Sequence, residues 1–494
     1  MNGGTLDVNG QTLTTGLLSG ETGKVTNGAA TPATLTLTNT GTQSYSSVIQ
    51  DGLGTLALGK GGAGTQILVG AHTYTGGTTI SGGTLQLGNV ALAQDGSIFG
   101  NVVNNGVFAI ANSFLPVTLN GNITGTGSLV KTGGGTLALN GNSSYSAGST
   151  ISTGLVVLGS GTALGSGNVT IANGSGIDLN GQTIANNFSS IAGVGSTGEG
   201  AFFNNSTPAG ITGAIGGGVN PGSFTIGGTG DITLERATSP NAFTITKINT
   251  GTLTLGGSLD NAFAQVTVND GTVIFAKAST AAVHAVGGAN SLTLNNGTVR
   301  LAGTGGDQIF NNNITTINGG TFDLNGTSET LGRLFGSSGA GKITNDLVSS
   351  SSTLTVGGSN GTGSDFNGII QDGAGGTGIV GITKIGTGTL SIGGTLDYTG
   401  ATTVNGGTLT ATSSITGTSA LTIAAGARFI LGGPGPAPAP FEEAGELSAS
   451  GGAAAVPEPG SMGLLLAGAL GFLSRRPKRL SRRVEKTDGS GLVS

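Results

Sequence analysis

The stretch KIGTGTLSIGGTLDYTGATTVNGGTLTAT, from Lys384 to Thr412, has the residue pattern that best indicates the fold. Threonine or serine alternates with leucine, isoleucine or valine, and the short runs end at Gly-Gly or Asn-Gly. Alternation with a period of two places the apolar side chains on one face of a strand. Glycine-containing pairs supply the positive φ that tight turns need. The stretch therefore predicts short strands separated by turns, and the body of the chain has no apolar pattern with helical spacing.

Copies of this stretch recur along the chain, as a search for internal repeats reveals. Three segments align without gaps: YTGGTTISGGTLQLG at 74–88, YSAGSTISTGLVVLG at 145–159 and YTGATTVNGGTLTAT at 398–412. A copy without the tyrosine, VTVNDGTVIFA, lies at 266–276. Upstream pieces are also shared: KTGGGTLAL from Lys131, KINTGTLTL from Lys247 and KIGTGTLSI from Lys384. Internal duplication explains the chain better than a set of unrelated domains.

An all-β repeat array could close as a Greek-key sandwich, a propeller or a parallel β-solenoid. The apolar positions are mostly small aliphatic residues, which suit a narrow core where like residues stack coil on coil. Segments of varied length separate the copies, and we expect a segment such as 195–220 to form a loop emerging from one coil. The solenoid is therefore favoured, with coils of roughly 20 to 25 residues, on the order of 18 to 20 coils and a length of about 90 Å.

The composition excludes several classes of function. The 494 residues include 100 glycines, no cysteine and no tryptophan, and only 8% are charged. Without cysteine there are no disulfides, thiolate metal sites or thiol nucleophiles. Seven of the 18 basic residues lie after residue 474, so residues 1–474 carry a net charge of −10. Because that body has no basic stripe with interleaved aromatic residues, we expect no nucleic-acid partner.

The repeats resemble the autotransporter-associated β-strand repeat, in which strands like GTLTL, YTGGTT and NGGTL follow one another. The resemblance is close at 127–159 and 382–412, good at 52–88 and partial at 245–276. It implies a right-handed parallel β-helix displayed outside the cell, and it implies no particular activity. The solenoid is expected to span residues 1–431.

The composition changes after Leu431. A proline-rich, glycine-rich and alanine-rich segment at 432–455 predicts an extended linker. An apolar run of 12 residues follows at 462–473, which as a helix would reach about 18 Å against a hydrocarbon core of about 30 Å. The basic cluster behind it would stay on the cytoplasmic side of a membrane. We expect residues 456–483 to act as one signal, with 484–494 as a polar tail.

This signal resembles the PEP-CTERM sorting signal. The residues that carry the resemblance are Val456, Pro457, Glu458 and Pro459, then Met462, Leu464, Leu465, Leu466, Leu470, Phe472 and Leu473, then Arg475, Arg476, Lys478 and Arg479. The resemblance implies recognition at Pro457-Glu458-Pro459 by an exosortase-type membrane enzyme, transient anchoring in the inner membrane, and delivery to the cell surface or an exopolysaccharide matrix. The alternative is a C-terminal apolar helix packed against the body.

The first residues, MNGGTLDVNG, have neither the basic region nor the apolar region of an export signal. Since Met1 also falls at the edge of a repeat unit, we expect the natural chain to begin upstream.

Catalytic chemistry is not expected from the ionisable residues. Asp7, Asp178 and Asp323 occupy the same place in three repeats, which predicts carboxylates that cap backbone N–H groups at coil turns. His72 and His284 are predicted to be ordinary surface or loop histidines. The other candidates, Glu235, Arg236, Asp365 and Asp372, form no cluster in the sequence. We expect no catalytic set, no metal and no cofactor.

The tyrosines Tyr74, Tyr145 and Tyr398 hold equivalent positions in three repeats. A row of exposed rings could stack on sugars, but one ring per repeat favours a role in core or turn packing.

Together these features predict a non-enzymatic surface or extracellular-matrix protein that acts as a scaffold or adhesin, with exopolysaccharide or cell-surface glycans as possible ligands. Two alternatives remain open. One is a β-helical carbohydrate-active enzyme, which needs acidic and basic residues converging from neighbouring coils. The other is an autotransporter-type passenger lacking its barrel.

Overall fold

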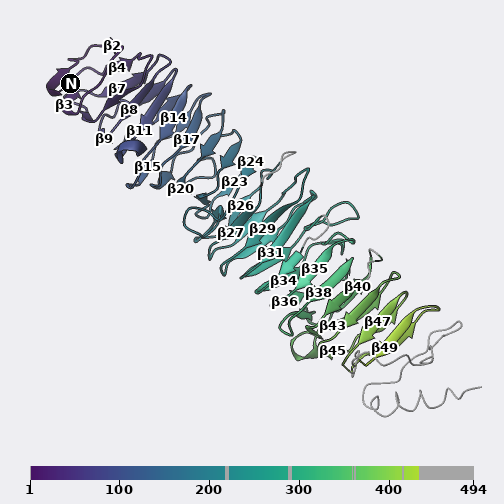
Figure 1. The fold of residues 1–494 in the computed structure, drawn as a ribbon. Helices are drawn as coiled ribbons and strands as arrows, with labels where there is room; N and C mark the ends of the chain where they lie inside the picture. Colours follow the sequence, from purple (N-terminus) through teal and green to yellow (C-terminus); the bar gives the residue numbers. More distant parts are fainter. Residues whose placement is uncertain are drawn as a thin grey trace, which may run out of the picture.

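The chain folds as a parallel β-solenoid of about 20 coils. The computed structural model describes residues 2–216, 222–287, 292–358, 360, 363–413, 415 and 417–432. Figure 1 shows these residues as an elongated rod, with the N-terminal strands at one end and β49 (Arg428–Leu431) at the other. The predicted all-β solenoid is confirmed.

The named strands pair in parallel within seven sheets, each built by stacking one strand from each coil on the next. In spatial order, the sheets that begin in the N-terminal half contain β1 (Asn2–Asp7), β3 (Thr22–Thr26) and β6 (Val48–Ile49); β16 (Ile123–Thr124), β13 (Val102–Asn104), β10 (Thr78–Ile80), β7 (Leu56–Lys60), β4 (Ala33–Leu37) and β2 (Leu13–Thr15); β24 (Phe188–Ile191), β21 (Val169–Ile171), β19 (Ser149–Ile151), β17 (Ser128–Lys131), β14 (Val107–Ile110), β11 (Thr84–Leu87), β8 (Thr65–Leu68) and β5 (Gln43–Tyr45); and β12 (Gly96–Ser97) and β9 (Gly70–Ala71).

Two long sheets and a shorter one carry the solenoid to its C-terminal end. They contain β15 (Val117–Leu119), β18 (Leu137–Leu139), β20 (Gly154–Leu158), β22 (Ser175–Asp178), β25 (Phe202–Phe203), β27 (Phe224–Gly227), β29 (Phe243–Lys247), β31 (Ala264–Val268), β33 (Leu292–Leu294), β35 (Ile314–Ile317), β38 (Arg333–Gly336), β41 (Ser364–Phe366), β44 (Thr389–Ile392), β47 (Thr408–Ala411) and β49; β23 (Thr183–Ile184), β26 (Ala209–Ile211), β28 (Ile232–Leu234), β30 (Thr252–Leu255), β32 (Thr272–Phe275), β34 (Thr298–Leu301), β36 (Thr321–Asp323), β39 (Lys342–Thr344), β42 (Ile369–Gln371) and β45 (Leu396–Asp397); and β37 (Glu329–Leu331), β40 (Ser351–Val356), β43 (Ile379–Lys384), β46 (Thr402–Val404) and β48 (Leu421–Ile423).

Helical structure is limited to two short 3-10 segments in the residues that the structure describes, η1 (Val90–Leu92) and η2 (Ala374–Gly376). No helix within this part of the chain is long and apolar enough to cross a membrane.

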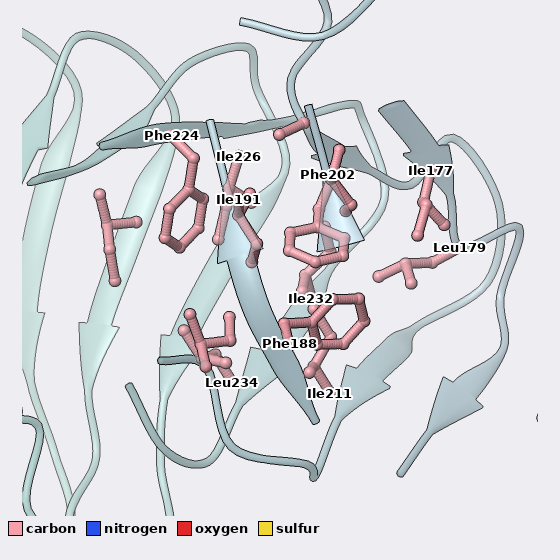
Figure 2. Close-up of a cluster of buried hydrophobic side chains, with 14 of the residues drawn as sticks. Ile177, Leu179, Phe188, Ile191, Phe202, Ile211, Phe224, Ile226, Ile232 and Leu234 are labelled. Carbon is pink, nitrogen blue, oxygen red and sulfur yellow. The ribbon is translucent and has the colours of Figure 1, made fainter. Parts of the chain in front are cut away.

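The core is a continuous column of apolar side chains inside the coils. Like residues stack on one another, as the phenylalanines Phe188, Phe202, Phe224 and Phe243 do, with successive ring centroids 4.8, 6.1 and 6.4 Å apart. Figure 2 shows Phe188, Phe202 and Phe224 among the isoleucines and leucines of neighbouring strands. Since a register slip of one residue would turn every apolar side chain outward, this stacking fixes the register.

The described part of segment 195–220, residues 195–216, does not form the predicted external loop. It contains β25 and β26, which pair with strands of the coils on either side. Phe202 and Ile211 are fully buried in the core. The prediction was wrong because this coil lacks the threonine-glycine signature while still supplying apolar residues at the inward positions.

Candidate functional site

Four lysines end equivalent strands and point into the turn that follows. Lys60, Lys131, Lys247 and Lys384 are all at most 2% exposed. Each Nζ donates to backbone carbonyls of that turn; Lys131 donates to the carbonyls of Thr132, Gly133 and Thr153 at 3.2, 2.6 and 3.3 Å. The carbonyls of Thr132 and Gly133 belong to the turn that follows Lys131, and that of Thr153 comes from the next coil. Lys60 and Lys384 make the equivalent inter-coil bonds to Gly82 and Gly406, whereas Lys247 donates to Ile248 and Asn249 of its own turn. These lysines have no acidic hydrogen-bond partner in the described residues.

A glycine of the next coil lies against each of the first three ammonium groups. A Cβ added at Gly83, Gly154 or Gly271 would lie 2.7 to 2.9 Å from the lysine Nζ, and each of these glycines has a positive φ between 62° and 79°. In these three repeats the glycine beside the ammonium is therefore required twice, by its positive φ and by the buried lysine.

Burial alters the acid-base behaviour of these lysines. It lowers the pKa of Lys131 and Lys247 to about 8, and it lowers the pKa of Lys60 and Lys384 in the same direction. Desolvation of the ammonium is the main cause in each case.

The repeated tyrosines belong to the core, as predicted. Tyr74, Tyr145 and Tyr398 are at most 1% exposed. Each hydroxyl pairs with the hydroxyl of the residue four positions later, at 2.7 Å to Thr78, 2.6 Å to Ser149 and 2.7 Å to Thr402. The rings are closed to solvent, so they offer no surface for stacking on a sugar.

The repeated aspartates cap turns, as predicted. Oδ1 of Asp7, Asp178 and Asp323 accepts the N–H of the asparagine two residues later, at 2.9 Å in each case. Those asparagines have φ between 45° and 47°, which places them in the left-handed region of the turn. Asp323 also accepts the N–H of Asp346 and pairs with Arg300 Nε at 2.8 Å.

A second aspartate pair joins coils through a threonine. Asp51 and Asp372 each accept the N–H and the hydroxyl of a threonine that directly follows a repeat tyrosine, with hydroxyl distances of 2.6 Å to Thr75 and Thr399. Asp372, which belongs to no cluster in the sequence, thus caps the backbone of a neighbouring coil.

Both histidines lie in segments between strands, as one of the two predicted placements has it, but they are buried, so the surface placement was wrong. His72 is fully buried, its Nδ1 accepts the N–H of Ile49 at 3.1 Å, and burial lowers its pKa to about 4. His284 is 4% exposed and stacks edge-on against Phe310 at 5.3 Å. Neither histidine is flanked by ligand residues in the sequence.

An ionisable column gathers around His284. The side chains of Asp260, His284, Asp307 and Glu329 come from four successive coils, 22 to 24 residues apart in the chain. Nδ1 of His284 lies 3.5 Å from Asp260 Oδ1, and its Nε2 lies 3.7 Å from Asp307 Oδ2. Asp307 Oδ1 is buried without a hydrogen-bond partner.

Each carboxyl of the ionisable column has a different environment. Burial raises the pKa of Asp260, but hydrogen bonds and charge from His284 outweigh that effect and leave its pKa lowered. Burial raises the pKa of Asp307 against the opposing influence of His284. Burial raises the pKa of Glu329 to about 8 despite backbone hydrogen bonds from Gln308 and Thr330. Within the described residues, no three acidic or histidine side chains are placed to hold a metal ion.

A groove lies on the outer face of the sheet that contains β40, β43 and β46. It encloses a cavity of about 400 Å³. Two small residues at outward positions, Gly381 and Ala401, leave the space, and Ser351, Thr399 and Ser419 border it. None of the residues that line the groove is charged.

The sequence-predicted sorting residues, from Val456 to Arg479, lie outside the described residues, as do the linker beyond Gly432 and the polar tail.

Comparison with protein families places two kinds of motif in the chain. The passenger-associated-transport-repeat matches residues 58–87, 129–158, 245–274 and 382–411. The PEP-CTERM protein-sorting motif matches residues 455–479. The chain therefore carries four passenger repeats and a C-terminal sorting motif, a combination typical of an exported protein that reaches the cell surface.

One curated relative is an adhesin autotransporter, the protein BmaC of Brucella suis biovar 1 (strain 1330). It is 32% identical over 190 residues, which cover 32% of this chain and 5% of the relative. The chain thus matches a small part of that protein's length. No solved structure matches the chain significantly.

Sequence reasoning missed the ionisable column and the role of the lysines. The repeated Lys-x-x-x-Gly-Thr pattern was visible, and each lysine stands 14 residues before the tyrosine position, but only the fold places Nζ in the turn. For the ionisable column, the one available signal was the near-constant spacing of Asp260, His284, Asp307 and Glu329, which matches the coil length.

Proposed function

We propose that this protein is a non-enzymatic surface or extracellular-matrix scaffold that acts as an adhesin and is sorted by an exosortase. The observation that carries the proposal is a PEP-CTERM motif at 455–479, on the C-terminal side of a solenoid whose last described strand is β49. A long solenoid presents a regular face along which weak contacts can add by avidity.

The proposed division of labour follows the chain. The solenoid is the cargo, residues 432–455 are the linker, and residues 456–483 are the signal, in which Pro457-Glu458-Pro459 is recognised by the enzyme. The apolar run 462–473 holds the chain transiently in the inner membrane, and the cations from Arg475 to Arg479 keep its end in the cytoplasm. Exopolysaccharide or cell-surface glycans are the proposed ligands.

Sorting is tested by replacing Pro457, Glu458 and Pro459 with alanine in the native host, with Glu442→Ala and Glu443→Ala in the linker as the matched control. The wild-type and control chains are expected in the surface or matrix fraction, with a C-terminus near the Pro-Glu-Pro sequence by mass spectrometry. The signal variant is expected to remain in the cell with its C-terminus intact. Equal surface delivery of all three chains would refute exosortase sorting.

The adhesive role is tested separately. Inert beads coated with the purified full chain are expected to attach to host-derived matrix, and beads coated with an unrelated surface protein are the control. Equal attachment of both kinds of bead would leave a scaffold without adhesive function.

One observation favours a second candidate, the carbohydrate-active enzyme. Asp260 and Asp307 converge on His284 from neighbouring coils, as that alternative requires. If this column hydrolysed or cleaved a polysaccharide, Asp307→Asn would abolish release of reducing ends, whereas Asp397→Asn, an exposed aspartate in another repeat, would not. Absence of turnover in the wild-type chain on a panel of polysaccharides would eliminate the enzyme.

A further inference from the structure

The groove beside the last repeat lies along a row of threonines. Thr330, Thr355, Thr383, Thr403 and Thr422 pair in register across five successive coils, one per strand from β37 to β48. Their side chains are half-exposed on the outer face. Neighbouring parallel strands lie about 4.8 Å apart, so the row offers a hydroxyl and a methyl group at each step along the rod.

The groove opens next to this row because side chains are missing. The outward position two residues before Thr383 is Gly381, and the position two residues before Thr403 is Ala401. A Cβ added at Gly381 would lie 3.1 Å from the Ala401 carbonyl, a close contact that a shift of a few tenths of an ångström relieves, and 3.5 Å from the Thr353 hydroxyl. The backbone there has no left-handed φ, so the conformation does not require glycine.

The third repeat fills the same two positions. Three residues before its buried lysine stands Thr244, and the residue opposite it in the next coil is Gln265. Their side chains are hydrogen-bonded, with Thr244 Oγ1 donating to Gln265 Oε1 at 3.2 Å. The solenoid therefore accommodates larger residues at these positions.

The side chains that line the groove are uncharged and mostly carry hydroxyl groups. Ser351, Thr353, Thr399 and Ser419 provide hydroxyl groups, and Ile379, 36% exposed, provides an apolar surface at one side. The Thr399 hydroxyl donates to the buried carboxylate of Asp372 at 2.6 Å, which orients its oxygen. No lining residue carries a positive charge, and the Asp372 carboxylate lies behind the wall.

We propose that this groove binds a short segment of a neutral, hydroxyl-rich glycan. The cavity of about 400 Å³ falls within the usual range for small-ligand sites, roughly 300 to 1,000 Å³. Serine and threonine hydroxyls can both donate to and accept from sugar hydroxyls, and Ile379 can cover an apolar sugar face. An acidic glycan would meet no cation and would approach the Asp372 charge. The inference rests on the proposed adhesive function and names the ligand class for it.

The test uses the purified full chain and two neutral probes, cellohexaose and mannohexaose, with hexagalacturonate as the acidic probe. Binding is followed by saturation-transfer NMR and titration. The groove variant combines Gly381→Thr and Ala401→Gln, which copies the pair that the third repeat already contains. The matched control combines Thr244→Gly and Gln265→Ala, which empties that pair and leaves the groove untouched.

The expected result is binding of at least one neutral probe by the wild-type and control chains, with a loss of about tenfold or more in the groove variant. Hexagalacturonate is expected to bind at least about tenfold more weakly than the neutral probe. The groove variant should keep the wild-type far-ultraviolet circular dichroism spectrum. Undetectable binding of both neutral probes, a preference for hexagalacturonate, or unchanged binding by the groove variant would each overturn the proposal. Surface delivery and bead attachment are measured independently, so failure here does not by itself refute the proposed function.

Discussion

The repeats at 129–158 and 245–274 solve the same packing problem with different side chains. Both keep the buried lysine, Lys131 in one and Lys247 in the other, with Nζ donating to turn carbonyls. Fourteen residues after the lysine, the repeat at 129–158 has Tyr145, and the repeat at 245–274 has Asn261. The amide of Asn261 is fully buried and joins the coils on both sides, accepting from the Ala237 N–H at 2.9 Å and donating to the Ala285 carbonyl at 3.1 Å.

The comparison indicates which part of the repeat is constant. The turn with the buried lysine is present in all four repeats, whereas the position of the tyrosine accepts either a ring or an inter-coil amide. The ionisable column begins at Asp260, directly beside the substituted position. Loss of the tyrosine thus coincides with the appearance of buried charge.

The largest effect should come from truncating the aromatic anchor. Tyr145→Ala removes a fully buried ring and is expected to destabilise its coils by about 3 to 5 kcal/mol. Asn261→Ala removes only an amide and should cost about 1 to 3 kcal/mol. Hydrogen exchange of peptides covering 137–158 and 252–275 measures both, with the outward-facing Thr150→Ala as a control. If both variants lost the same free energy of unfolding, the ring and the amide would contribute equally to stability.

A pH titration should reveal the buried lysines. Besides Lys131 and Lys247 these include Lys277, which is fully buried and whose Nζ donates to the carbonyls of Glu235 and Leu259. Burial lowers the pKa of Lys131, Lys247 and Lys277 to about 8 in the folded chain, against about 10.5 when unfolded. Between these values the unfolded state binds more protons, so the free energy of unfolding should rise from pH 8 to pH 10, by at most about 1.4 kcal/mol per pH unit and lysine. Above pH 10 the buried tyrosines, whose pKa burial raises, oppose this trend.

The measurement is the urea midpoint at pH 8 and pH 10. A Lys131→Met, Lys247→Met and Lys277→Met triple variant should show a smaller rise than the wild type, and exchanging the exposed Lys24 for methionine should not change it. An unchanged rise in the triple variant would contradict desolvated lysines.

The ionisable column should respond in the opposite sense. Burial raises the pKa of Glu329 to about 8, so between about pH 4.5 and 8 the folded state binds more protons than the unfolded state. Stability from this group is therefore lost as pH rises through that range. Glu329→Gln should reduce the decline of the urea midpoint between pH 5 and pH 8, and Glu21→Gln, in an exposed setting, serves as the control. A steeper decline in the Gln variant would contradict the assignment.

The smallest effects are expected at the turn caps. Asp178→Ala loses one backbone N–H partner and should cost about 1 kcal/mol. Asp323→Ala should cost more, because its buried carboxylate holds two N–H groups and Arg300. Thermal unfolding of both variants ranks them, and the reverse order would show that burial does not strengthen this cap.

Much of the fold was predictable because the repeats encode local geometry. Alternation gave the strands, Asn-Gly pairs gave the turns, and the positions of Asp7, Asp178 and Asp323 predicted N–H caps that the structure contains. The core position of the tyrosines was predictable from one ring per repeat. The segment 195–220 was misjudged because its inward residues stack without a repeat signature.

The repeating strand and turn, the preference for a parallel solenoid, the sorting motif and the spacing between lysine and tyrosine could be read from the sequence, since each depends on residues close together in the chain. Which residues of neighbouring coils meet is visible in the folded structure alone. Register partners are separated by 20 residues between Leu58 and Thr78 but by 28 between Ser351 and Ile379. Because coil length varies in this way, the spacing of Asp260, His284 and Asp307 does not by itself establish that they meet, and no spacing predicts that Gly381 and Ala401 leave a groove.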